Sequence, residues 1–318
     1  MAFTYPAARR SDVVDTHHGR EVADPYRWLE DPDADETKAF VAAQNAVTEP
    51  YLAGLPDRDG LVERMTELWD NPRTDPPGWR GRGDDRVMVW THNDGLADQP
   101  IYWVRRGEDP SIEPEVLLDP NTLSDDGAVA VVGAALSDDG GLLAYLVSEA
   151  GSDRQHLAVR RTDTADDLPD RLDHLRFSSI AWYGDGFFYT RWPEVEPGST
   201  APVKDPAIHY HRIGDDQADD VLVFHNDDDP EPNYAAVVTE DDRYLILIEY
   251  LGTDQRNGLL YLDLAAHGST FTDPEPGRDG GPVPVEAWVR LVELGEAMHS
   301  FVHHRSDEGS RLLVHTDR

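Results

Sequence analysis

The sequence contains no cysteine and very little lysine. Each shortage limits the kinds of functional site that the chain can contain. Without cysteine, a disulfide framework, a thiolate metal site and a cysteine nucleophile are all excluded. The absence of cysteine favours a cytoplasmic location. Lys38 and Lys204 are the only lysines, so arginine carries almost all of the positive charge.

Positive charge is scarce relative to negative charge. The chain has 28 basic and 63 acidic residues, which gives a formal net charge of −35. Nucleic acids and anionic membranes are bound by clustered cations, so we expect neither as a partner. The excess of acidic residues has two explanations: the protein prefers cationic peptides as ligands, or the acidic side chains form a surface that keeps the protein solvated. We favour the second explanation.

Long apolar runs are absent as well. Runs such as Ala128–Leu136 and Tyr244–Ile248 are far shorter than the roughly 20 residues that span a bilayer. The first 20 residues lack the apolar stretch of about 7–15 residues that an export signal contains. These features also lead us to expect no membrane partner.

Helical spacing predicts two helices between Asp33 and about Asn71. The second has the tighter amphipathic stripe, formed by Leu61, Val62, Met65, Leu68 and Trp69. Pro50, Gly54 and Pro56 are expected to separate the helices, and Asp57 could cap the second one. A proline-rich stretch follows, so residues 1–74 are predicted to form a helical arm and residues 75–318 a separate β domain.

After Trp79 the pattern changes to short apolar strands, each introduced by an acidic or glycine turn. Such units start near residues 83, 137, 184, 240 and 295, and each contains a second strand. A period of about 40–50 residues with several strands per repeat is typical of β-propeller blades. The predicted fold is therefore mainly β, a partial propeller of the seven-bladed type with about five blades present, preceded by the helical segment.

Two blocks of sequence resemble the prolyl oligopeptidase family of serine peptidases. The first contains Tyr5-Pro6, His18-Gly19 and Val22–Asp31, which reads V-A-D-P-Y-R-W-L-E-D. The second is Leu118–Gly127, which reads L-D-P-N-T-L-S-D-D-G. The resemblance implies that the helical arm packs on a C-terminal α/β-hydrolase domain and that the propeller admits short proline-containing peptides. It also implies hydrolysis of these peptides after proline.

The catalytic serine of that family lies after the propeller, outside this sequence. A nucleophile elbow needs G-x-S-x-G, and no serine here has glycine two positions before it. We therefore predict no catalytic residue, no metal or other cofactor, no α/β-hydrolase domain in this chain, and no peptidase activity of the chain alone. Asp31, Asp33 and Asp35 alternate as in a calcium loop, but Glu36 stands where such a loop needs glycine.

The resemblance also implies two substrate-binding residues, Phe177 and Thr253. Phe177 matches a propeller aromatic that contacts the peptide, although an aromatic at a strand start can equally belong to the core. Thr253 matches a loop that faces the same substrate cavity, where relatives often carry cysteine. Two alternatives remain: a peptidase of the oligopeptidase B type with the same architecture, and a propeller that binds or scaffolds peptides without chemistry.

Overall fold

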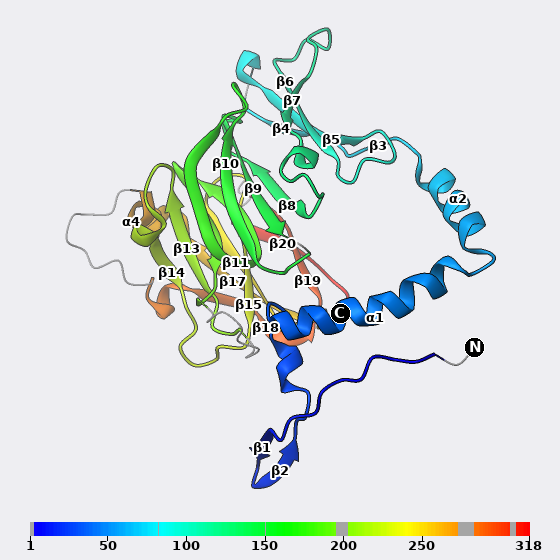
Figure 1. The fold of residues 1–318 in the computed structure, drawn as a ribbon. Helices are drawn as coiled ribbons and strands as arrows, with labels where there is room; N and C mark the ends of the chain where they lie inside the picture. The colour runs from blue at the N-terminus through cyan, green and yellow to red at the C-terminus, as the bar shows by residue number, and fades with distance from the viewer. Residues whose placement is uncertain (1–2, 82, 150, 195–202, 273–282, 306–309) are drawn as a thin grey trace. The chain divides into compact units, whose positions relative to one another are not determined.

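The computed structural model describes residues 3–81, 83–149, 151–194, 203–272, 283–305 and 310–318, and Figure 1 shows its ribbon. The chain separates into two compact units. The first contains the chain up to Asn71, and the second contains Pro72–Pro193 and Lys204–Arg318. The sequence analysis predicted a boundary between residues 74 and 75.

The first unit contains a short hairpin and the two predicted helices. Its elements are β1 (Val14–His17), β2 (Arg20–Ala23), the 3-10 helix η1 (Arg27–Glu30), α1 (Asp35–Ala53) and α2 (Arg58–Trp69). The segment before β1 lies against α1, where Nε of Arg9 is 2.6 Å from Oε1 of Glu36. Among the described residues, no helix is long and apolar enough to cross a membrane.

The boundaries of the two helices differ from the prediction in two details. Pro50 was expected to end the first helix, but α1 continues to Ala53 and contains it. Pro50 lies in the last turn, where it removes one backbone hydrogen bond and crowds the carbonyl four residues earlier, so few residues of the helix follow the disturbance. Asp57 precedes α2 but makes no side-chain capping hydrogen bond. Its backbone is already in the helical region (φ −97°, ψ −3°), whereas a capping residue is normally extended.

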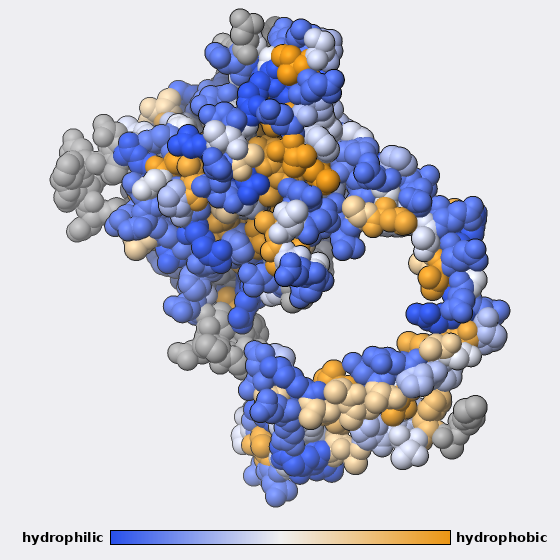
Figure 2. All heavy atoms as spheres, turned by 45° about the horizontal axis from the view of Figure 1, so that its top comes forward, coloured by the Kyte–Doolittle hydropathy of each residue, from blue (hydrophilic) through white to orange (hydrophobic). Residues whose placement is uncertain are grey.

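The apolar stripe of α2 is exposed. Leu61 is 61% exposed, Met65 68% and Trp69 65%, and apolar side chains along the helices of this unit are visible in Figure 2. A stripe of this size on one helix is unusual for a free surface. The sequence analysis predicted that these helices need a partner surface.

The second unit consists almost entirely of antiparallel strands. They are β3 (Arg73–Thr74), β4 (Gly78–Arg80), β5 (Val87–Asn93), β6 (Ile101–Arg106), β7 (Glu115–Leu118), β8 (Val129–Leu136), β9 (Leu142–Glu149), β10 (Gln155–Arg161), β11 (Asp167–Tyr183), β12 (Gly186–Arg191), β13 (Ala207–Arg212), β14 (Val221–Phe224), β15 (Asn233–Val238), β16 (Tyr244–Tyr250), β17 (Asn257–Asp263), β18 (Val289–Ala297), β19 (His299–Arg305) and β20 (Arg311–Thr316). The short helices between them are η2 (Gly83–Asp85), η3 (Pro120–Thr122), η4 (Gln217–Asp219), α3 (Leu264–His267), α4 (Ser269–Thr272) and η5 (Val285–Ala287).

The strands pair in sequence order, as the meandering strands of propeller blades do. Blade one is the sheet β3-β5-β6-β7, in which β4 also pairs with β5. A 7-stranded sheet, β8 to β14, follows, then the 4-stranded sheet β15-β16-β17-β18 (blade four) and the hairpin β19-β20. These sheets confirm the predicted mainly-β propeller fold.

The 7-stranded sheet is two blades that share one strand. The first part of β11 pairs with β10, as in Leu172 opposite Leu157. The second part pairs with β12, from Ile180 opposite Tyr189 to Tyr183 opposite Gly186. We call β8, β9, β10 and the first part of β11 blade two, and the second part of β11 with β12, β13 and β14 blade three.

The core lies between neighbouring blades. In β9, Leu143 and Tyr145 pack in one cluster with residues of blade one, whereas Ala144 and Leu146 pack in another cluster with residues of blade three. Successive side chains of a strand point to opposite faces, so a strand buried on both faces needs a continuous apolar run. This explains the runs that the sequence analysis recognised.

In blades one to four, each predicted repeat unit contains the second and third strands of the blade, and the last unit contains the hairpin β19-β20. The units predicted to start near residues 83, 137, 184, 240 and 295 begin with β5, β9, β12, β16 and β19. The predicted companion strands are β6, β10, β13, β17 and β20. The first strands of blades two and four, β8 and β15, are apolar as well but mostly only partly buried, because they line the channel cavity described below.

Candidate functional site

Phe177 lies in β11 where the strand passes from blade two to blade three. Its φ is +46° and it is 57% exposed, so it is not a core aromatic. A non-glycine residue in this region costs roughly 1–2 kcal/mol because Cβ approaches the following carbonyl. Such outliers persist where the surrounding structure fixes them and are common at binding sites.

Neighbouring groups fix the backbone on both sides of Phe177. The backbone N–H of Trp192 donates to the carbonyl of His174 at 2.8 Å, and its indole N–H donates to the carbonyl of Arg176 at 2.8 Å. On the other side, Oγ of Ser179 accepts from the backbone N–H of Ala236 at 2.7 Å. The aromatic ring is therefore presented from a fixed position.

Thr253 is exposed in the loop between β16 and β17. The next residue, Asp254, is paired with Arg256, with 2.5 Å between Oδ2 and Nη2. Hydrogen bonds from the guanidinium and from the backbone of Arg256 lower the pKa of Asp254 to about 2. The carboxylate is thus ionised at neutral pH and paired with Arg256 within this loop.

Strand direction places Phe177 and Thr253 at the same end of two adjacent blades. Ser179 bonds Ala236, and the following residues of β11 and β15 line one cavity, so the two strands run in the same direction. Phe177 therefore lies beside the start of β15. Asn233, which begins β15, is opposite Tyr250, and the loop with Thr253 follows directly.

A cavity of about 550 Å³ lies at the other end of these strands. The innermost strands β4, β8, β11 and β15 all line it, which is the position of the central channel in a propeller. Two tryptophans, Trp79 and Trp182, contribute apolar surface, and Arg80 contributes positive charge.

Carboxylates outnumber cations around this channel cavity. Asp138, Glu240 and Asp242 line it together with Arg80. Burial raises the pKa of Asp138, which Arg80 opposes. Burial, and then the charge of Asp138, raise the pKa of Asp242, so carboxylates of two different blades interact across the cavity.

The sequence analysis missed these carboxylates, although a signal was present. Blades two and four have the same turn between their first two strands, S-D-D-G from Ser137 and T-E-D-D from Thr239. In each turn the hydroxyl bonds the carboxylate two residues later, at 2.7 Å for Ser137 and Asp139 and 2.8 Å for Thr239 and Asp241. Recognising this repeat would have placed Asp138 and Asp242 on the same end of the propeller.

A buried charged cluster joins blade two to blade three. Nδ1 of His211 is 2.7 Å from Oδ1 of Asp220, and Nε2 is 3.2 Å from Oδ1 of Asp170. All three side chains are almost fully buried. Burial lowers the pKa of His211, but hydrogen bonding and charge interaction with Asp220 and then with Asp170 raise it overall, which favours the imidazolium with both ring nitrogens donating.

Asp241, His304 and Ser310 form a hydrogen-bonded chain between blade four and the hairpin β19-β20. Oδ2 of Asp241 is 2.7 Å from Nδ1 of His304, and Nε2 of His304 is 2.9 Å from Oγ of Ser310. That Oγ is also 2.6 Å from the hydroxyl of Tyr244. The chain resembles a catalytic relay, but the second partner of Ser310 makes it a network that ties the hairpin to blade four.

No group of three or more potential metal ligands occurs in the part of the chain that the structure describes. His303 and His304 are adjacent in β19, and adjacent strand residues point to opposite faces.

These strands define a β-propeller domain with a cavity at the position of the central channel. The N-terminal β-propeller domain of prolyl oligopeptidases is the family model that matches, over residues 5–318. The chain therefore belongs to the prolyl oligopeptidase family, as the resemblance predicted.

Relatives match along nearly the whole chain. A prolyl endopeptidase from Elizabethkingia miricola is 33% identical over 317 residues, which are 99% of this chain and 41% of the relative. Prolyl oligopeptidase A from Amanita bisporigera is 31% identical over 99% of this chain and 43% of its own length. The chain thus spans less than half of these relatives.

Solved structures agree with the sequence comparisons. A mutant of prolyl oligopeptidase B from Galerina marginata, bound to a 35mer hydrolysis and macrocyclization substrate, superposes with a TM-score of 0.75. It is 27% identical, and the match covers 99% of this chain and 44% of that one.

Proposed function

We propose that these residues are the N-terminal arm and part of the propeller of a serine endopeptidase that hydrolyses short peptides after proline. The observation that carries the proposal is the 33% identity to a prolyl endopeptidase along 99% of this chain. The reaction is acyl transfer to water by a serine triad, which an α/β-hydrolase domain outside these residues supplies. The propeller controls which peptides reach it.

The partners proposed for this chain are that hydrolase domain and short proline-containing peptides. The exposed stripe of α2, with Met65 and Trp69, supports a covering partner for the arm. A cytoplasmic location is proposed from the cysteine-free composition.

Phe177 and Thr253 are proposed to contact the peptide. An aromatic ring offers a large apolar contact area, and a fixed backbone reduces the entropy that binding costs. Phe177 has both properties, since it is 57% exposed and its backbone is held by Trp192 and Ala236. Thr253 lies at the same end and can contribute a hydroxyl.

Replacing Phe177 with alanine in the complete peptidase is expected to raise KM for a Gly-Pro peptide about five- to tenfold with little change in kcat. This corresponds to about 1–1.4 kcal/mol, within the range for loss of one apolar contact. Steady-state kinetics with a fluorogenic Gly-Pro peptide measure the change in KM and in kcat.

A Phe177→Gly variant separates binding from folding. Glycine tolerates φ of +46° without strain, so this variant should unfold at the same temperature as the unmodified protein, or higher, and still show the raised KM. A KM unchanged in both variants contradicts the proposed contact.

A preference for basic residues, as in oligopeptidase B, is the second candidate. The carboxylates of Asp138, Glu240 and Asp242 at the channel cavity favour it, because negative charge in a cleft attracts cationic peptides. Comparing a substrate with proline and one with arginine before the cleaved bond distinguishes the two.

A further inference from the structure

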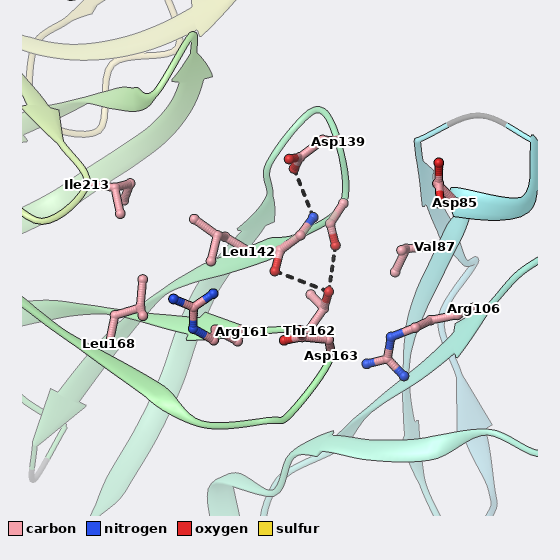
Figure 3. A pocket seen from close by; sticks show the side chains of 12 residues that line it. Asp85, Val87, Arg106, Asp139, Leu142, Arg161, Thr162, Asp163, Leu168 and Ile213 are labelled. Carbon is pink, nitrogen blue, oxygen red and sulfur yellow. Dashed lines mark hydrogen bonds between the residues drawn. The ribbon is translucent and has the colours of Figure 1, made fainter.

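A second cavity, of about 500 Å³, is lined by residues of blades one, two and three. Figure 3 shows it from close by. Its volume falls within the range of roughly 300–1,000 Å³ that is usual for small-molecule sites.

One wall of the cavity is backbone that is fixed in place. Gly140 has φ of +77°, and a Cβ added there would lie 2.9 Å from Cβ of Val87, so glycine allows blade two to approach blade one. The hydroxyl of Thr162, which is 2% exposed, donates to the carbonyl of Gly140 at 2.7 Å. This wall is therefore preformed and bare of side chains.

Arg161 is the cation in the cavity whose guanidinium can bind an anionic group of a ligand. It is exposed, and within the described ranges its guanidinium has no ion pair or hydrogen bond. The other cation, Arg106, is 2.9 Å from Oε2 of Glu115. Asp139 is already occupied, because it accepts hydrogen bonds from Ser137 and from the backbone of Gly141.

Apolar side chains accompany Arg161 on its side of the cavity. Leu142, Leu168 and Ile213 lie there in Figure 3, while Asp85 and Arg106 lie on the opposite side. A free guanidinium beside an apolar wall matches a carboxylate attached next to an apolar side chain, because a guanidinium binds carboxylate through two parallel hydrogen bonds. Such a group is the C-terminal residue of a peptide.

We propose that this cavity binds a short peptide by its free C-terminal carboxylate. Arg161 holds the carboxylate, and the last side chain, an apolar one, packs against Leu168 and Ile213. The carboxylates of Asp85 and Asp163, which also line the cavity, are placed to attract the ammonium group of a peptide only two or three residues long. The proposal is independent of the peptidase function, because it concerns binding without turnover.

The test is binding of the dipeptide Gly-Leu to the 318-residue chain, measured by isothermal titration calorimetry and compared with Gly-Leu amide. The amide keeps the ammonium and the side chain but lacks the carboxylate. We expect the amide to bind at least about tenfold more weakly, since a hydrogen bond to a charged group contributes about 1.5–3 kcal/mol.

Two variants locate the site. Arg161→Met keeps an apolar stem but removes the charge, and it should weaken Gly-Leu binding at least about tenfold. Arg20→Met removes the same charge from an exposed strand residue of the first unit and should leave binding unchanged.

Three results overturn the proposal. The first is the absence of saturable Gly-Leu binding up to about 20 mM, a concentration at which even very weak small-ligand sites are detected. The second is equal affinity for the dipeptide and its amide. The third is unchanged binding by the Arg161→Met protein. The comparison of the two ligands uses the unmodified chain, so it holds even if a variant folds poorly.

Discussion

Replacing His211 with alanine is expected to lower the unfolding free energy of the propeller by about 3–5 kcal/mol. The substitution leaves the carboxylates of Asp170 and Asp220 buried without their cation, which costs more than the loss of the imidazole contacts themselves. Asp220 keeps the hydroxyl of Tyr189 at 2.6 Å, and Asp170 keeps the backbone N–H of Gly214 at 2.6 Å. Neither donor carries a positive charge. Urea unfolding followed by tryptophan fluorescence measures the change.

His209→Ala is the matched control for this substitution. His209 lies two residues earlier on β13. Among the described residues, its side chain hydrogen-bonds a backbone carbonyl alone, that of Ala207 at 3.4 Å, so its loss leaves no charge unpaired. We expect a destabilisation of about 1 kcal/mol or less, as for a typical hydrogen bond. Equal effects of the two substitutions would contradict the role of His211 as the counter-ion of two carboxylates.

The contribution of His211 should also depend on pH. Burial lowers its pKa, but hydrogen bonding and charge interaction with Asp220, followed by those with Asp170, outweigh burial and raise the pKa above 6.5. A raised folded-state pKa gives stability that is complete below the unfolded pKa and is lost as pH rises through the folded pKa. The difference in stability between the unmodified protein and His211→Ala should therefore shrink above neutral pH. A difference that grows with pH would contradict the imidazolium.

Gly186→Ala is expected to destabilise blade three by about 3 kcal/mol or more, at the upper end for overpacked sites. A Cβ at Gly186 would lie 2.0 Å from the carbonyl oxygen of His211 and 2.8 Å from the ring of Tyr210. The first contact is with backbone, which cannot rotate away, so β12 and β13 must separate locally. Thermal unfolding followed by circular dichroism measures the loss.

Gly78→Ala serves as the control because Gly78 is also the first residue of a strand, β4. A Cβ there would meet only the carbonyl oxygen of Val89 at 3.8 Å, an ordinary contact. Its stability should change by less than about 1 kcal/mol, as glycine-to-alanine substitutions at compatible positions do. If both variants unfold at the same temperature, the close approach at Gly186 does not limit stability.

The strands of the propeller could be predicted because their signal is local. Tyr244–Ile248 is a continuous apolar run whose residues face blade three and the β19-β20 hairpin alternately, with Leu245 and Leu247 in one cluster and Tyr244 and Ile246 in another. Burial on both faces thus appears directly in the sequence.

The sharing of β11 between two blades could not be predicted. The passage depends on His174 and Phe177 adopting positive φ, a conformation that is uncommon for non-glycine residues and an outlier for a bulky residue such as phenylalanine. The backbone around Phe177 is held by hydrogen bonds from Trp192 to the carbonyl of Arg176 and from Ala236 to the hydroxyl of Ser179. Trp192 and Ala236 are distant from Phe177 in the sequence. Tertiary contacts decide the geometry here.

The buried cluster around His211 is also invisible in the sequence. His209 and His211 occur in the same H-Y-H stretch, yet only His211 faces carboxylates. Asp170 is 41 residues away in the chain, and the pairing exists only because β11 continues from blade two to blade three. Likewise, the repeated turns at Ser137 and Thr239 were visible as acidic turns, but the shared cavity of Asp138 and Asp242 required the fold.

Cleavage of a fluorogenic peptide with Gly-Pro before the scissile bond tests the central claim most directly. The assay compares the 318-residue chain with a version extended through the downstream reading frame. Activity only in the extended protein, with proline preferred over arginine at the cleaved bond, is the result we predict. Activity of the 318-residue chain that a serine-directed phosphonate abolishes would contradict the account, as would an extended protein that binds peptides without cleaving them.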